Sequence, residues 1–296
     1  TDIIICLAHL GMDAASTVTS VKIAEEVEGI DLIIDGHSHT VLEQGHAVGD
    51  TLIVSTGEYD KNLGIVQLTV TEGQVTDKKA SLISKDEAAE VVPDEAIVKT
   101  IETIEAEQAV LLSEVIGKTE VALEGARELV RKGETNLGNL IADAMVKLTG
   151  ADCALTNGGG IRASIAAGDI TKGNIIDVLP FGNYIVAKVV TGADIKAALE
   201  NGTSAYPELQ GGFPHVSGIT YMIDTGKPVG DRIVDIQVKG KPLDLNGSYI
   251  LATNDFLAAG GDNYTMFADD AILNEYGGLD EAVIAYVKEK GIISPK

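Results

Sequence analysis

The sequence predicts a mixed α/β protein in two parts joined by a helix. Two continuous apolar runs, residues 3–8 and 31–36, are typical of strands buried in a parallel sheet. Residues 94–113 place apolar side chains at helical spacing behind Pro93, with an acidic first turn, which predicts one long helix. From about residue 116 the chain is long enough for an independent α/β domain. We therefore expect domains over 1–90 and 116–296, with a linker helix over 91–115.

The remaining elements follow from the same periodicities. The first part is expected to contain a helix near 14–27 and strands at 52–54 and 64–70. In the second part we expect a strand over 153–155 and helices over 135–148, 193–201 and 279–290. No apolar run is long enough to span a membrane.

The composition limits the partners of this chain. Lys and Arg number 22 against 45 Asp and Glu, so the formal net charge is −23. Such a chain repels nucleic acid and anionic membrane surfaces. A small anionic ligand then requires local cations or metal ions. The two cysteines, Cys6 and Cys153, lie in apolar strands of different predicted domains, so we expect buried thiols rather than a disulfide.

Four of the five histidines lie within the first 46 residues, and three of them close apolar runs. His9 follows the first run, and His37 and His39 follow the second, at strand ends where ligands gather in α/β sheets. On a strand His37 and His39 would share a face, whereas on a loop they can point apart. Three such histidines favour zinc, manganese, iron or a pair of such ions over ordinary strand-end histidines. His46 and His215 have no other histidine close to them at a strand end, and they are expected to be surface or core residues.

Arginine is rare in this chain and is concentrated in the second part. Three of the four arginines are Arg127, Arg131 and Arg162. The planar guanidinium group suits bidentate binding of phosphate. Arg127 and Arg131 are four residues apart, so on a helical turn they share one face. The alternative is a pair of solvated helix arginines.

Two glycine-rich segments and two phenylalanines suggest a site for a polar, aromatic ligand. The segment 157–162 reads Asn-Gly-Gly-Gly-Ile-Arg, and its glycines, Gly159 in the centre, permit close approach of backbone to a ligand. Asp262 follows a second glycine pair and can accept hydrogen bonds from sugar hydroxyls. Phe181 and Phe256 can stack on the two faces of a base, whereas core packing is the alternative.

Together these segments resemble the C-terminal domain of the 5'-nucleotidase family, which includes ecto-5'-nucleotidases and bacterial periplasmic UDP-sugar hydrolases. The strings that carry the resemblance are Asn-x-Gly-Asn, Asn-Gly-Gly-Gly-Ile-Arg, Leu-Pro-Phe-Gly and Phe-Leu-Ala-x-Gly-Gly-Asp. They stand in this order at residues 136–139, 157–162, 179–182 and 256–262. The match spans nearly the whole chain.

The resemblance also implies a role for each residue of the site. Phe181 and Phe256 would sandwich the nucleobase, and Asn157 would hydrogen-bond it. Asp262 would hold the ribose hydroxyls, and the three arginines would hold phosphate or the sugar edge. Asn183, which follows Phe181 and a glycine, and the glycine loop, residues 157–162, complete the implied set of ligand-binding residues.

The histidines resemble the last two motifs of the calcineurin-like metallophosphoesterases, His-x-Gly at His9 and Gly-His-x-His at His37 and His39. The resemblance assigns His9 and His37 to one ion and His39 to a second, with zinc or manganese expected. The family's earlier motifs, Asp-x-His, Gly-Asp and Gly-Asn-His-Asp/Glu, do not occur in this sequence. We therefore expect this chain to be part of a larger protein, with the catalytic residues upstream and metal occupancy here partial or absent.

The expected function is hydrolysis of nucleotide phosphoesters, chiefly nucleoside 5'-monophosphates, by a water activated by two metal ions. Alternatives are a nucleotide-binding module without catalysis, or hydrolysis of 2',3'-cyclic nucleotides or UDP-sugars at the same site. The resemblance implies an extracellular, periplasmic or cell-envelope location. It also implies that the linker helix lets the second domain swing a bound nucleotide to the metal site.

Overall fold

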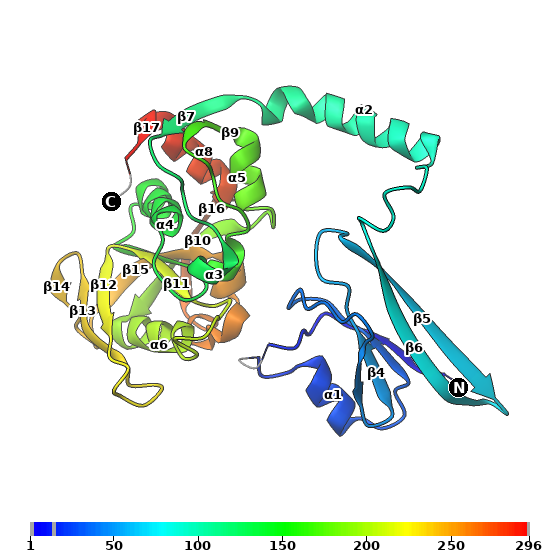
Figure 1. Cartoon of the computed structure of the whole chain (residues 1–296). Helices are drawn as coiled ribbons and strands as arrows, with labels where there is room; N and C mark the ends of the chain where they lie inside the picture. The colour runs from blue at the N-terminus through cyan, green and yellow to red at the C-terminus, as the bar shows by residue number, and fades with distance from the viewer. Residues whose placement is uncertain (1–2, 14–15, 295–296) are drawn as a thin grey trace. The chain divides into compact units, whose positions relative to one another are not determined.

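The computed structural model describes residues 3–13 and 16–294, and within them it confirms a mixed α/β class (Figure 1). The chain divides into two compact units, Thr1–Lys99 and Thr100–Lys296. Each unit has its own sheets. Among the described residues, no helix has the length and apolar character needed to cross a bilayer.

The first unit is built on a four-stranded sheet with the order β1-β2-β4-β3. Its strands are β1 (Ile5–Leu7), β2 (Leu32–Ile34), β4 (Thr51–Val54) and β3 (His46–Val48). β1, β2 and β4 are parallel, as the continuous apolar runs predict, and β3 is antiparallel. The prediction that the first run is buried was wrong, since Ile5 and Leu7 are 53% and 83% exposed on β1, the edge strand of this sheet. Ile33 and Ile53, from adjacent strands, have no exposed surface and form the centre of this sheet.

One helix accompanies this sheet and is shorter than predicted. α1 runs over Ser20–Glu26, and the side chain of Thr19 caps it by accepting the N–H of Lys22. Residues 14–15, where the predicted helix was expected to begin, lie outside the described residues.

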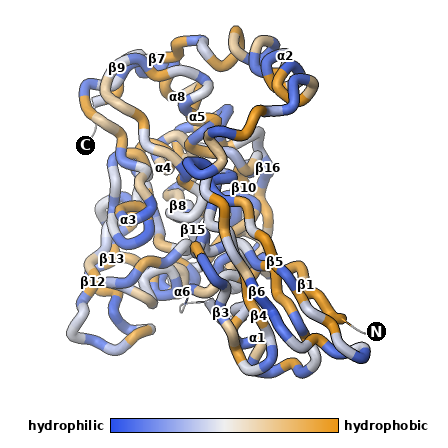
Figure 2. The backbone as a smooth tube through the Cα atoms, turned by 45° about the vertical axis from the view of Figure 1, so that its right-hand side comes forward, coloured by the Kyte–Doolittle hydropathy of each residue, from blue (hydrophilic) through white to orange (hydrophobic). Residues whose placement is uncertain are grey.

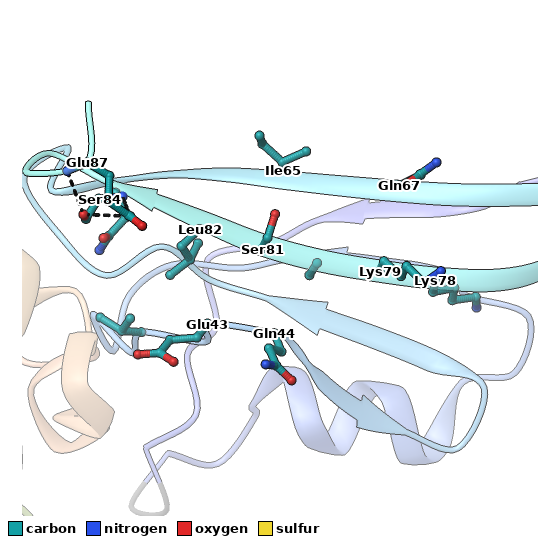
Figure 3. A pocket seen from close by; sticks show the side chains of 13 residues that line it. Glu43, Gln44, Ile65, Gln67, Lys78, Lys79, Ser81, Leu82, Ser84 and Glu87 are labelled. Atoms are coloured by element: carbon teal, nitrogen blue, oxygen red, sulfur yellow. Dashed lines mark hydrogen bonds between the residues drawn. The ribbon is translucent and has the colours of Figure 1, made fainter. Parts of the chain in front are cut away.

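A long antiparallel hairpin completes the first unit. Its strands are β5 (Asn62–Thr71) and β6 (Gln74–Ser84), and hydrophobic and hydrophilic residues are mixed along both (Figure 2). Lys78 ties the hairpin to the sheet, because its Nζ donates to the carbonyl oxygen of Asp31 at 3.0 Å and lies 3.3 Å from the Asp31 carboxylate. A hollow of about 920 Å³ extends along the hairpin and is lined by residues of both strands, among them Ile65 and Gln67 of β5 and Lys79, Ser81 and Leu82 of β6 (Figure 3).

A single long helix connects the first unit to the second. α2 covers Glu95–Leu112, within one residue of the predicted range at each end. The carboxylate of Asp94 accepts the N–H groups of Ala96 and Ile97, which stabilises the first turn. None of its eighteen residues is buried, and the division between the two units falls inside it.

The second unit is built on a five-stranded sheet with the order β11-β8-β15-β10-β16. Its strands are β11 (Pro214–Ser217), β8 (Cys153–Asn157), β15 (Ser248–Asn254), β10 (Tyr184–Thr191) and β16 (Ala271–Gly278). β8 and β15 are parallel, and the other neighbours are antiparallel. Two three-stranded sheets flank it, formed by β12 (Ile219–Ile223), β13 (Ile233–Val238) and β14 (Lys241–Pro242), and by β17 (Ile292–Ile293), β7 (Val115–Thr119) and β9 (Gly168–Thr171).

Helices cover both faces of this sheet. Consecutive residues point to opposite faces, so Ala154 joins the cluster beneath α4 (Asn136–Thr149), α5 (Lys172–Val178) and α8 (Leu279–Lys290). Its neighbours Cys153 and Leu155 join the cluster beneath α6 (Gly192–Gly202). Two short helices, α3 (Arg127–Val130) and α7 (Asp255–Ala258), carry residues of the predicted site.

The cysteines and the second pair of histidines fill ordinary structural positions. Both thiols are free, and Cys153 is buried, which raises the pKa of its thiol to about 12. The expectation of burial was wrong for Cys6, which is only partly covered on the edge strand β1. His46 is exposed on β3. His215 is a core residue whose Nε2 donates to the carbonyl oxygen of Val130 at 2.8 Å.

Candidate functional site

Three loops of the second unit meet at one edge of its central sheet. β8 ends at Asn157 and its parallel neighbour β15 ends at Asn254, so both loops leave the same edge. β10 runs antiparallel to β15, with Ile185 opposite Asn254, so the segment ahead of β10 arrives at this edge as well. The topology therefore brings together three segments: the glycine loop after β8, residues 179–183 with Phe181 before β10, and residues 255–262 with Phe256 after β15.

Asn254 is the centre of the hydrogen bonds at this edge. Its Nδ2 donates to Oδ1 of Asn157 at 3.0 Å and to Oγ1 of Thr156 at 3.1 Å. Its Oδ1 accepts the N–H of Leu257 and so caps α7, the helix that carries Phe256. Asn254 is 2% exposed, so these bonds are shielded from water.

Asn157 and Asp262 are in direct contact. The Nδ2 of Asn157 donates to Oδ2 of Asp262 at 2.8 Å, across 105 residues of sequence. Asp262 has a φ of 51°, and Gly260 before it has a φ of 93°, so this turn uses left-handed backbone. The Nδ2 of Asn201 donates to the carbonyl oxygen of Asp262 at 3.0 Å and helps to hold this turn.

The two phenylalanines are exposed and do not pack in the core. Phe181 is 60% exposed and Phe256 is 45% exposed, which is unusual for large aromatic side chains. The guanidinium group of Arg162 stands 5.6 Å from the centre of the Phe181 ring. Phe256 lies against Gly261, where a Cβ would come within 2.5 Å of the ring, so only glycine fits there.

A hydrogen bond joins the two phenylalanine segments. The Nδ2 of Asn183, two residues after Phe181, donates to Oδ1 of Asp255 at 2.7 Å, and Asp255 precedes Phe256. A cavity of about 10 Å³ is lined by Phe181 together with Thr156, Leu179 and Asn183 among others. It has room for one water molecule, so a ligand as large as a base would contact the exposed rings instead.

α3, which we call the arginine helix because it begins at Arg127 and is followed by Arg131, lies against the glycine loop. Arg127 begins α3 and Arg131 caps its end, which confirms the predicted helical turn, and Arg131 is 8% exposed. A Cβ on Gly158 would lie 1.9 Å from the carbonyl oxygen of Val130, so the absence of a side chain lets the loop contact α3. The N–H of Gly159 donates to the carbonyl oxygen of Gly211 at 2.7 Å, which fixes the loop from its other side.

Asn254 and Asp255 were not among the residues proposed from the sequence. An asparagine at a strand end, directly before a short helix, is a signal for an N-cap residue and could have identified Asn254. Its bonds to Thr156 and Asn157 leave no trace in the local pattern, since they join residues almost one hundred positions apart.

Replacing Asn254 with alanine is expected to lower the unfolding free energy of the second unit by about 1–3 kcal/mol. The change removes the cap of α7 and leaves polar groups of Thr156 and Asn157 without their buried partner. Urea unfolding monitored by circular dichroism measures the difference. Asn246→Ala, in an exposed turn, is the control. Equal midpoints for Asn254→Ala and this control would contradict the prediction.

The loops after β1 and β2 carry the three histidines of the first unit. These strands are parallel neighbours, so both loops leave the sheet at one edge. The carboxylate of Asp35 accepts the N–H of Leu10 at 2.9 Å and the N–H of Gly11 at 3.1 Å. These bonds hold the loop of His9 beside the segment that contains His37 and His39.

The ring of His9 lies beside that of His37, and His39 contacts Glu58. The rings of His9 and His37 meet edge to face with centroids 5.2 Å apart. A Cβ on Gly36 would lie 3.0 Å from Nδ1 of His9, so glycine allows this approach. His37 and His39 have φ values of 69° and 56°, so they stand on a loop and not on a strand. The Nδ1 of His39 lies 2.6 Å from Oε2 of Glu58.

The surroundings of these histidines suit metal binding without completing a metal site. A hydrogen bond from Lys61, with a further one from His39, lowers the pKa of the Glu58 carboxyl although desolvation opposes the shift. A carboxylate on one ring nitrogen orients a metal-binding imidazole. The described residues form no group of three or more His, Cys, Asp or Glu side chains able to hold an ion. Metal binding by His9, His37 and His39 stays a prediction, and such a metal site would require further ligands.

Comparisons with known proteins place the geometry in context. Residues 115–269 match the family model for the 5'-nucleotidase C-terminal domain. A trifunctional nucleotide phosphoesterase of Bacillus subtilis (strain 168) is 37% identical over 310 residues, covering 99% of this chain and 21% of that protein. A 5'-nucleotidase of Diplobatis ommata is 30% identical over 334 residues, covering 99% of this chain and 57% of that protein.

A solved structure of a 5'-nucleotidase precursor also matches this chain. The crystal structure of a 5'-nucleotidase precursor from Thermus thermophilus matches with a TM-score of 0.73 and 33% identity, over 93% of this chain and 60% of that one. This chain thus spans between about a fifth and three fifths of the length of these relatives.

Proposed function

The chain belongs to the 5'-nucleotidase family, and on that premise we propose that its second unit holds the nucleoside of a nucleotide whose phosphoester the whole protein hydrolyses. Nucleoside 5'-monophosphates are the proposed substrates. The observation that carries the proposal is one sheet edge that joins two exposed phenylalanines to Asn157, Asp262 and the arginine helix.

The chemistry of this edge suits a nucleoside from base to sugar. Phe181 and Phe256 offer exposed ring faces on which a base can stack. Asn157 can hydrogen-bond the base edge, and the carboxylate of Asp262 can accept bonds from two ribose hydroxyls. In a protein of net charge −23, the concentration of arginines here provides local attraction for a phosphate.

The proposed reaction also requires the first unit. When bound by His9, His37 and His39 together with ligands from the rest of the protein, two divalent ions would supply an activated water and neutralise phosphoryl charge. Zinc and manganese suit these imidazole donors. We also propose an extracellular, periplasmic or cell-envelope location, as is typical of the family, and a swing of the second unit about α2.

Calorimetry with adenosine tests the nucleoside site independently of catalysis. We expect this chain to bind adenosine and AMP, and we expect adenosine binding to survive a metal chelator because the proposed contacts involve no ion. AMP should bind more tightly than adenosine, since the arginines add phosphate contacts. Absence of heat with millimolar adenosine would refute the site.

A second candidate is a nucleotide-binding module without catalysis. One observation favours it. The residues proposed to bind the nucleoside all lie in the second unit, whereas the described histidines belong to no group of three or more possible metal ligands. Hydrolysis by the longer protein separates the two functions. A panel of 5'-monophosphates, 2',3'-cyclic nucleotides and UDP-sugars then identifies the preferred phosphoester.

A further inference from the structure

Lys188 is a buried lysine in the middle of the central sheet. It lies on β10, opposite Leu251 of β15 and near Ile272 of β16, and is 2% exposed. Alternation along the strand places it on the same face as Val190, within the cluster that contains Leu257 and Phe267. An apolar side chain would be expected at such a position. Burying an ammonium group is costly unless it is hydrogen-bonded, so its partners define its role.

The partners of Lys188 stand at the two ends of one loop. Its Nζ donates to the carbonyl oxygen of Ala258, the last residue of α7, at 3.2 Å. It also donates to the carbonyl oxygen of Phe267, at the end of the short 3-10 helix Thr265–Phe267. Desolvation lowers the pKa of Lys188, while the negative charges of Asp270 and Asp269 act in the opposite direction.

The loop between these carbonyl groups, residues 259–266, has a strained backbone and carries part of the nucleoside site. Gly260, Asp262 and Asn263 all have positive φ values, of 93°, 51° and 63°. Left-handed backbone at non-glycine residues persists only where the surroundings hold it. Gly261 of this loop supports the ring of Phe256, and Asp262 is bonded to Asn157. A change in the loop would therefore displace both groups.

We propose that Lys188 is a positioning residue, whose ammonium group holds both ends of residues 259–266 and so keeps Phe256 and Asp262 in place for the nucleoside. This inference rests on the proposed function. Lys188 does not reach the ligand surface, since it is buried on β10 beneath α7. It acts only through the loop.

Replacing Lys188 with methionine tests this role, because methionine retains the length and apolar stem of the side chain and removes its donors. We expect adenosine affinity to fall about tenfold in calorimetry. Hydrogen exchange of the amides in 259–266 should become faster. The melting temperature should be maintained or raised, since an apolar replacement of a buried charge is often neutral or stabilising.

The controls separate positioning from charge and from stability. Adenosine is uncharged, so loss of one positive charge does not alter its long-range attraction to the protein. Lys241→Met removes the same charge from an exposed position on β14 and should leave affinity and loop exchange unchanged. If Lys188→Met does not fold, Lys188→Gln retains one donor group, and intermediate losses of affinity and loop protection are expected.

The experiment distinguishes failure of the proposed nucleoside site from failure of the positioning role of Lys188. If the unaltered chain does not bind adenosine, the nucleoside site itself is refuted. If the unaltered chain binds adenosine, and Lys188→Met binds it equally well or leaves exchange of 259–266 unchanged, the positioning role is refuted. A lower melting temperature with unchanged affinity of the folded protein would likewise reduce Lys188 to a purely structural residue.

Discussion

Replacing both Phe181 and Phe256 with alanine is expected to abolish adenosine binding to this chain. Stacking of a base on one aromatic ring contributes about 1–3 kcal/mol, so each single replacement should weaken binding by about 5- to 150-fold. The two rings are 60% and 45% exposed, so their removal should cost little stability. Calorimetry of the two single variants and the double variant measures the loss.

A matched control for these variants lies in the first unit. Tyr59 is 68% exposed, and Tyr59→Ala removes an exposed aromatic ring of similar size from outside the proposed site. Its affinity for adenosine should equal that of the unaltered chain. If the double phenylalanine variant retains that affinity, neither ring contacts the base, and the proposed nucleoside site is wrong.

The second large effect concerns catalysis. This chain alone is expected to hydrolyse AMP at the rate of the enzyme-free control, because the proposed pair of ions needs more ligands than His9, His37 and His39. A longer protein in which this chain is joined to a segment that supplies the remaining metal ligands is expected to hydrolyse it faster by orders of magnitude. Phosphate release measured with zinc and with manganese tests both statements.

Variants of the longer protein assign this gain to the histidines. His39→Ala should remove most of the activity and leave adenosine affinity intact, because His39 belongs to the first unit. His46→Ala, an exposed histidine of the same unit, should retain full activity. A longer protein with no more activity than this chain would favour the non-catalytic module.

Periodic patterns predicted the regular elements because those patterns record burial directly. α8 occupies the predicted residues 279–290, and α2 lies within one residue of its prediction. The histidine loops were also correctly placed at the ends of parallel strands. α1 ends at Glu26, within one residue of its prediction, but it begins only at Ser20, because Thr19 has extended backbone and caps the helix there. Apolar spacing alone does not reveal such a boundary.

The sequence by itself determined which rare side chains stand beside glycines at strand ends, since residue type and spacing are local properties. It therefore identified Phe181, Phe256, Asn157 and Asp262 as site candidates before any contact was known. Only the tertiary structure showed that Asn254 and Lys188 donate hydrogen bonds to the segments that carry these groups. Their partners lie about 70 to 100 residues away in the chain, and the order of strands in the sheet brings them together. A strand pattern records which face a side chain occupies, but the partner on that face is set by long-range packing.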